Sequence, residues 1–265
     1  PGRWRGYDES MILHVLGLGS PTHPLDPSVW ERYTRTYQWR EFHGYAHLNF
    51  APLFGHQYSH VWIDFRGIRD AFMREKGSDY FENSRRATLA QRAYAKDNPG
   101  GWAEYGPDVW GLTASDGPGP LELEIDGVRR AFRPYWARGA AAGDIRDDGT
   151  IVPTAAGGSV PFAPEETIRA LVTISERWGE QVYDRYGFRD AFNPTASVAA
   201  ETRRGAVVPG VGWFDDDYLG IDQGPIVLMI ENHRSGLIWE TMRDNPYIVR
   251  GLCRAGFTGG WLEGR

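Results

Sequence analysis

Four segments combine carboxylates with aromatic and amide side chains in patterns that core packing does not require. They are residues 4–9, 54–64, 109–119 and 215–225, and polar residues 231–234 follow the last of them. Glycoside hydrolysis needs such a surplus of acids, because one carboxylic acid protonates the leaving oxygen while a carboxylate activates water or attacks the sugar. Each segment also has a structural explanation, since acids near a helix start act as caps and an acid in a turn bonds its own backbone.

The second segment carries His56, His60 and Asp64 at positions i, i+4 and i+8, which share one face of a helix. Two histidines four residues apart can share a metal ion, as in zinc proteases. However, Gln57 stands where that motif has its catalytic glutamate. We therefore favour a hydrogen-bonded polar stripe, partly structural and partly substrate-facing, and predict neither a metal site nor a cofactor.

The composition is that of an ordinary globular protein of 265 residues, with 41% hydrophobic and 24% charged residues. A net charge of −6 provides no basic field for nucleic acid. The single cysteine, Cys253, excludes an intramolecular disulfide, and no apolar run approaches the roughly 18 residues that span a bilayer. Aromatic residues reach 14%, which suits either a sugar-binding cleft or an aromatic core.

Helical periodicity and capping residues predict seven main helices, which together favour a single all-α domain. We expect them at residues 6–17, 26–37, 55–65, 79–97, 164–178, 222–243 and 246–254. A short additional helical segment is expected after residue 65, ending near Met73. Long irregular stretches separate them, and the Asp126-Gly127 pair between 121–124 and 128–132 predicts a β-hairpin.

Several long motifs are similar to those of the bacterial glucoamylase-like (glycoamylase) domain family, from Trp4 to Leu262. The matching stretches include WRGYDESMILHVLGLGSPTHPL, PLFGHQYSHVWIDFRGIRD, VWGLTASDGPG and DYLGIDQGPIVLMIENHRSGLIW. That family includes endo-β-1,2-glucanases and a related domain of cyclic β-1,2-glucan synthases.

The resemblance implies an (α/α)6 barrel that binds a glucan across its wide end and cleaves β-1,2-glucan with inversion. Such a barrel has twelve helices and this sequence offers about eight, so we expect residues 1–265 to form one domain whose first helices precede Pro1. The resemblance also implies a periplasmic or secreted bacterial protein, which we expect to be a monomer. Two alternatives stay open: a transglycosylating or glucan-binding domain of a glucan synthase, and a non-catalytic glucan-binding fragment.

Carried over by motif, the resemblance implies that Glu9 is the general acid and Asp222 the base that activates water. Inversion requires roughly 6.5–9.5 Å between the two carboxyl groups, and burial among aromatic side chains should raise the pKa of the acid. Further residues implied to contact substrate are Asp8, His56, Tyr58, Asp64, Arg86, Trp110, Asp116 and Glu231.

Overall fold

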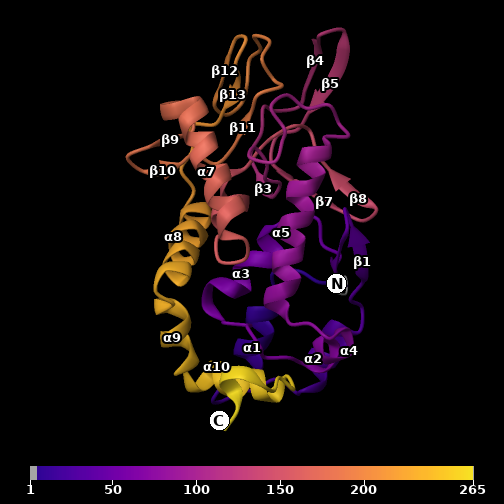
Figure 1. Cartoon of the computed structure of the whole chain (residues 1–265), viewed down its shortest axis with the longest axis vertical. Coiled ribbons are helices and arrows are strands. Elements are labelled where there is room, and N and C mark those ends of the chain that lie inside the picture. The colour runs from indigo at the N-terminus through magenta and orange to yellow at the C-terminus, as the bar shows by residue number, and fades with distance from the viewer. Residues whose placement is uncertain (1–4, 265) are drawn as a thin grey trace.

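The computed structural model describes residues 5–264, and most of its regular structure is helical (Figure 1). Trp4, the first residue of the first motif, lies outside this range. The α-helices are α1 (Met11–Gly19), α2 (Ser28–Thr34), α3 (Phe54–Trp62), α4 (Ala71–Lys76), α5 (Tyr80–Asp97), α6 (Pro153–Gly157), α7 (Pro164–Trp178), α8 (Gly220–Arg234), α9 (Leu237–Arg243) and α10 (Pro246–Arg254). Two single-turn 3-10 helices are η1 (Gly179–Gln181) and η2 (Gly260–Leu262). The expectation of a helical fold is confirmed at this level.

Short antiparallel strands decorate the helices in the part of the chain that the structure describes. They are β1 (Trp39–Phe42), β2 (Tyr45–Leu48), β3 (Ala114–Ser115), β4 (Leu121–Ile125), β5 (Val128–Phe132), β6 (Trp136–Ala137), β7 (Gly139–Ala141), β8 (Asp144–Arg146), β9 (Tyr183–Asp184), β10 (Gly187–Phe188), β11 (Phe192–Asn193), β12 (Ala206–Val208) and β13 (Gly212–Phe214). Five sheets are two-stranded, and the sixth has the order β11-β13-β12.

The predicted hairpin is present as β4–β5. Its register runs from Leu121 opposite Phe132 to Ile125 opposite Val128. Asp126 and Gly127 both take positive φ (51° and 74°), as a tight hairpin turn requires. The expectation of only one hairpin is wrong, because β1–β2 and the pairs between residues 114 and 214 add further strands.

Helix caps explain where the best-predicted helices begin and end. Asp79 caps α5 by accepting a bond from the backbone N–H of Glu82, and α5 ends where Asn98 turns left-handed at φ 45°. Asn245 caps α10 in the same way, with Pro246 in its first turn. The predicted single helix over 222–243 is instead two, because Gly236 adopts φ 75° and breaks it between α8 and α9.

Helices α1 and α10 pack together at the end of the molecule opposite the β4–β5 hairpin (Figure 1). Their backbones approach closely through glycine: a Cβ on Gly251 would lie 2.1 Å from the carbonyl oxygen of Val15. Around this contact Met11, Leu252 and their neighbours form one buried apolar cluster, so α1 and α10 share a core.

Helix α3 lies inside the molecule and is tied to α6 and α8. Its Gln57 donates to the carbonyl of Ala155 (2.8 Å) and to the hydroxyl of Ser159 (2.7 Å). From α6, the hydroxyl of Thr154 donates to the carbonyl of Asp222 (3.1 Å). These bonds fix the first turn of α8 against α3, which is the frame of the site described next.

Over residues 5–264, no helix combines the length and apolar character that crossing a membrane would demand.

Candidate active site

A cavity of about 330 Å³ opens where α3, α6 and α8 meet. This volume lies at the lower end of the roughly 300–1,000 Å³ of small-molecule sites. Glu9 and Asp222, 213 positions apart in the sequence, both line it. The lining residues are Glu9, Phe54, Gln57, Tyr58, Thr113, Ala114, Ser115, Asp116, Tyr135, Thr154, Leu219, Ile221, Asp222 and Pro225.

A larger groove of about 1200 Å³ adjoins this cavity, because Glu9 and Phe54 line both. Asp8 and the arginines Arg5, Arg32 and Arg35 are among the other residues of the groove. Glu9 therefore stands where the larger groove meets the smaller cavity.

Glu9 is held immediately before α1. Its backbone carbonyl accepts a bond from the hydroxyl of Ser59 on α3 (3.1 Å), which ties the segment to the cavity wall. Partial burial raises the pKa of Glu9 above its usual range, and the neighbouring charge of Asp8 adds to this effect. A carboxyl group with a raised pKa is suited to donating a proton near neutral pH.

Asp8 lines the larger groove and is not part of the cavity lining. It is buried, and its Oδ1 accepts bonds from the backbone N–H of Ser10 (2.9 Å), from the Ser10 hydroxyl (2.5 Å) and from the Tyr33 hydroxyl (3.0 Å). These bonds fix the turn that leads into α1. Asp8 therefore helps to position its neighbour Glu9.

Asp222 lies in the first turn of α8 and is 7% exposed. Burial raises its pKa to about 6, with a smaller contribution in the same direction from the charge of Asp215, while a hydrogen bond from Asp190 lowers it. Its Oδ2 has no donor. Asp222 is thus a buried carboxyl group that is largely ionised at neutral pH.

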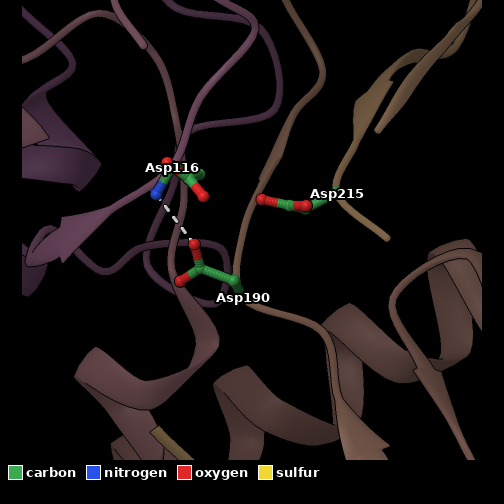
Figure 2. A group of neighbouring side chains, drawn as sticks. All are labelled: Asp116, Asp190 and Asp215. Atoms are coloured by element: carbon green, nitrogen blue, oxygen red, sulfur yellow. Dashed lines mark hydrogen bonds between the residues drawn. The ribbon is translucent and has the colours of Figure 1, made fainter. Parts of the chain in front are cut away.

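Three further aspartates, Asp116, Asp190 and Asp215, lie close together (Figure 2). Asp190 and Asp215 both interact with Asp222. Oxygens of these three carboxylates lie within 4.8 Å of one another. The backbone N–H of Asp116 donates to Oδ2 of Asp190 at 2.7 Å, and Figure 2 shows the carboxylate of Asp215 directed toward that of Asp116. Like charges this close must be relieved by protons or by a cation.

Strand pairing explains how these aspartates meet. The chain runs antiparallel at β11 and β13, so that Asp215 donates its N–H to the carbonyl of Ala191 and Asp190 donates to that of Asp217, both at 3.0 Å. Burial, and then the charge of Asp222, raise the pKa of Asp190 to about 8. Burial raises the pKa of Asp215 to about 7, although bonds from the N–H groups of Asp217 and Asp216 oppose the shift.

Four of the residues expected at the site share the cavity: Glu9, Tyr58, Asp116 and Asp222. Their roles in binding and catalysis stay predictions from the family resemblance. Asp190 and Asp215 were not among the expected residues, although Asp215 belongs to the Asp-Asp-Asp run of the fourth segment. Asp190 gives no sequence signal, since an isolated aspartate after an arginine is common on protein surfaces.

Three residues expected to contact substrate are instead buried in the core. His56 and Trp110 are 0% exposed and Asp64 is 1% exposed, and none lines the cavity or the groove. His56 contacts the Phe50 carbonyl through Nε2 and the Asn83 amide through Nδ1. A side chain without exposed surface cannot touch a ligand, so we remove these three from the substrate-binding set.

The histidine stripe of α3 does not assemble a metal site. His60 contacts the hydroxyl of Ser84 through Nε2 (3.0 Å), and burial lowers its pKa to about 3. Asp64 forms a two-pronged ion pair with Arg66 and a further one with Arg243. Each member of the stripe therefore has its own partners, and its role is structural.

Arg86 and Glu231 also lie outside both hollows. Arg86 pairs with Glu82 one turn earlier on α5 (2.8 Å) and donates to the carbonyl of Ala46 (3.3 Å). Glu231 sits near the C-terminal end of α8, where it pairs with Arg234. Helical spacing of opposite charges accounts for both residues.

Comparison with known proteins agrees with the resemblance found in the sequence. The Glycoamylase family model, described as "Putative glucoamylase", matches residues 1–246. The exo β-1,2-glucooligosaccharide sophorohydrolase (non-reducing end) of Parabacteroides distasonis is 28% identical over 272 residues, covering 93% of this chain and 33% of that protein.

Solved structures give the same result. An endo-β-1,2-glucanase from Chitinophaga pinensis, in a complex with sophorotriose and glucose, is 30% identical with a TM-score of 0.79, covering 97% of this chain and 56% of its own. A "putative glucoamylase" from Bacteroides uniformis is 37% identical with a TM-score of 0.76, covering 98% and 56%. The chain thus spans a third of the curated relative and just over half of these structures.

Proposed function

This chain belongs to the Glycoamylase family, and from that premise we propose that it hydrolyses β-1,2-linked glucan. The names of two similar proteins, a sophorohydrolase and an endo-β-1,2-glucanase, support this substrate. One observation carries the proposal: Glu9 and Asp222, from opposite ends of the sequence, line one cavity, and Glu9 also lines the larger groove beside it.

In this mechanism Glu9 is the general acid. Its position at the junction of groove and cavity suits a group that protonates the oxygen of a bond lying across that junction. Partial burial raises its pKa, which is the direction that favours the protonated form required in the first step.

Asp222 is the general base. It takes a proton from a water molecule as the water oxygen attacks the anomeric carbon, while the glycosidic bond breaks and the leaving oxygen receives the proton of Glu9. Inversion of the anomeric centre follows if water enters between Asp222 and the sugar, which needs roughly 6.5–9.5 Å between the two carboxyl groups.

Tyr58 and Asp116 complete the proposed sugar contacts inside the cavity, and Asp8 contributes from the groove. Tyr58 is 36% exposed on α3, so its ring is available to the C–H face of a sugar. The exposed Tyr135 on the opposite lining offers a second ring.

The finer architecture is part of the proposal. We propose that the described helices belong to an (α/α)6 barrel, with the cavity at its loop-rich end. A periplasmic or secreted location and a monomeric state stay predictions from the family resemblance.

Incubation of the purified protein with linear β-1,2-glucan tests the activity, with chromatography for sophoro-oligosaccharides. NMR of the first products distinguishes inversion, which releases the α-anomer. Products longer than the substrate in the presence of sugar acceptors would favour the transglycosylating alternative. Tight binding by calorimetry without any product would favour a glucan-binding role.

A further inference from the structure

Asp190 and Asp215 are buried acids beside this site to which the proposed mechanism gives no role, and Asp190 is the one that interacts with Asp222 through a side-chain hydrogen bond. Asp190 lies between β10 and β11, in a segment held against the first turn of α8. Gln223 of α8 donates from its amide to the carbonyl of Phe188. A Cβ on Gly187 would lie 2.4 Å from Oε1 of Gln223, so the two segments are in direct contact.

Asp190 and Asp222 are both buried, and a side-chain hydrogen bond between them raises the pKa of Asp190 and lowers that of Asp222. Asp190 is 1% exposed, and its Oδ2 is occupied by the bond from the N–H of Asp116. Its Oδ1 and the Oδ2 of Asp222 both lack a donor. Two buried acceptors without a donor between them are costly, and one shared proton satisfies both.

The charged groups around Asp190 all favour its neutral form. Asp222 faces it from α8, Asp116 from the loop after β3, and Asp215 from the end of β13. Each of these is an acid, and each would repel a second negative charge on Asp190.

The arginines Arg138 and Arg189 donate to backbone carbonyls of this cluster. They form their ion pairs with other carboxylates, those of Asp148 and Asp184. Arg189 donates from Nη1 to the backbone carbonyl of Asp215 (3.3 Å), and its Nη2 lies 3.9 Å from the carboxylate of Asp184. The cluster therefore has to hold protons or a cation.

We propose that Asp190 is a positioning residue that keeps a proton at neutral pH and donates it in a hydrogen bond to Asp222, holding Asp222 ionised and oriented as the base. This inference rests on the proposed function of Asp222. When water is deprotonated, its proton goes to Asp222, while the proton of Asp190 remains on Asp190. The bond from Asp190 thus stabilises the carboxylate before the reaction without being consumed in it.

Two variants separate the hydrogen bond from the charge. In Asp190→Asn, the amide oxygen accepts from the N–H of Asp116 and the amide nitrogen donates to Asp222, as the protonated acid does. In Asp190→Ala both bonds are lost. If Asp190 instead carries a negative charge, both variants remove that charge from beside Asp222.

The first measurement is thermal unfolding against pH, which needs no catalytic activity. The pKa of Asp190 is raised from near 4 in the unfolded chain to about 8 in the folded protein. Wild type therefore loses stability relative to Asp190→Asn as pH rises through this window. We expect the melting temperature of Asp190→Asn minus that of wild type to increase steadily from pH 4 to pH 8. A difference that does not change with pH overturns the proposal.

The second measurement is the pH dependence of kcat on β-1,2-glucan. We expect Asp190→Ala to move the acidic limb to higher pH, because Asp222 loses a bond that favours its ionised form, and Asp190→Asn to leave that limb in place. A shift to lower pH in both variants overturns the proposal. If wild type has no activity, the proposed hydrolysis fails, but the unfolding experiment still tests whether Asp190 keeps its proton. The failure of one proposal can therefore be told apart from the failure of the other.

The third measurement tests a cation in place of the proton, using Ca²⁺ and Mg²⁺ alone with wild type. No change in melting temperature at millimolar concentration supports the shared proton. A rise that Asp190→Asn abolishes means that a cation neutralises the cluster, and overturns the proposal.

Discussion

The buried ion pair between Arg138 and Asp148 should be the most sensitive point of the cavity wall. Arg138 is 0% exposed and Asp148 2% exposed, and two parallel bonds join them, Nε to Oδ1 at 2.7 Å and Nη2 to Oδ2 at 2.8 Å. Nη1 of Arg138 also donates to the carbonyls of Ser115 (2.9 Å) and Asp116 (3.1 Å), both in the cavity lining.

Replacement of Arg138 by Met leaves the carboxylate of Asp148 buried without its partner. Breaking a buried pair from one side costs about 3–5 kcal/mol of unfolding free energy. For a chain of this size about 1 kcal/mol lowers the melting temperature by roughly 2–4 °C, so the expected fall is roughly 6–20 °C.

Urea unfolding followed by tryptophan fluorescence measures this loss. The double variant Arg138→Met with Asp148→Leu should recover a large part of it, because no uncompensated charge remains. Arg129→Met is the matched control, since Arg129 pairs with Glu122 on the surface and its loss should change stability by no more than about 0.5 kcal/mol. The reasoning fails if Arg138→Met costs under about 1 kcal/mol, or if the double variant is less stable than the single one.

Two further predictions concern packing and pH. Gly251→Ala places a Cβ 2.1 Å from the Val15 carbonyl oxygen and should lower the free energy of unfolding by about 1–3 kcal/mol in urea. The control Gly224→Ala has open space around its Cβ and should be neutral or stabilising. Equal effects of the two substitutions would refute the close contact of α1 and α10. His60, whose pKa is lowered to about 3, stabilises the fold fully above its unfolded pKa near 6.5 and loses this contribution as pH falls. Wild type should therefore lose about 1.4 kcal/mol per pH unit relative to His60→Gln below pH 6.5, and parallel stability curves for the two proteins would contradict this.

Local signals in the sequence predict the helices that carry their own caps. Asp79 and Asn98 mark both ends of α5, and Pro164 marks the start of α7. Helix α6 also begins at a proline, Pro153, but it has only five residues, all of them buried, and contacts from Gln57 hold it in place. Such a short helix depends on the tertiary structure around it, so its sequence alone does not reveal it.

The same limit applies to the site. Glu9, Asp116 and Asp222 belong to motifs that the sequence singles out, and the structure places all three in the lining of one cavity. Asp190 reaches the site only through the pairing of β11 with β13, whose register no local pattern encodes. Trp110 was expected to contact substrate but is buried in the core. The sequence alone does not distinguish a buried tryptophan from one that stacks on a sugar.

The central claim is that Glu9 and Asp222 are the acid and the base of one reaction. The most direct test measures β-1,2-glucan cleavage and calorimetric glucan binding for wild type, Glu9→Gln and Asp222→Asn. We predict that each variant loses a factor of about 10²–10⁴ in kcat while its glucan affinity and melting temperature stay close to those of wild type. Normal turnover by either variant would contradict the account.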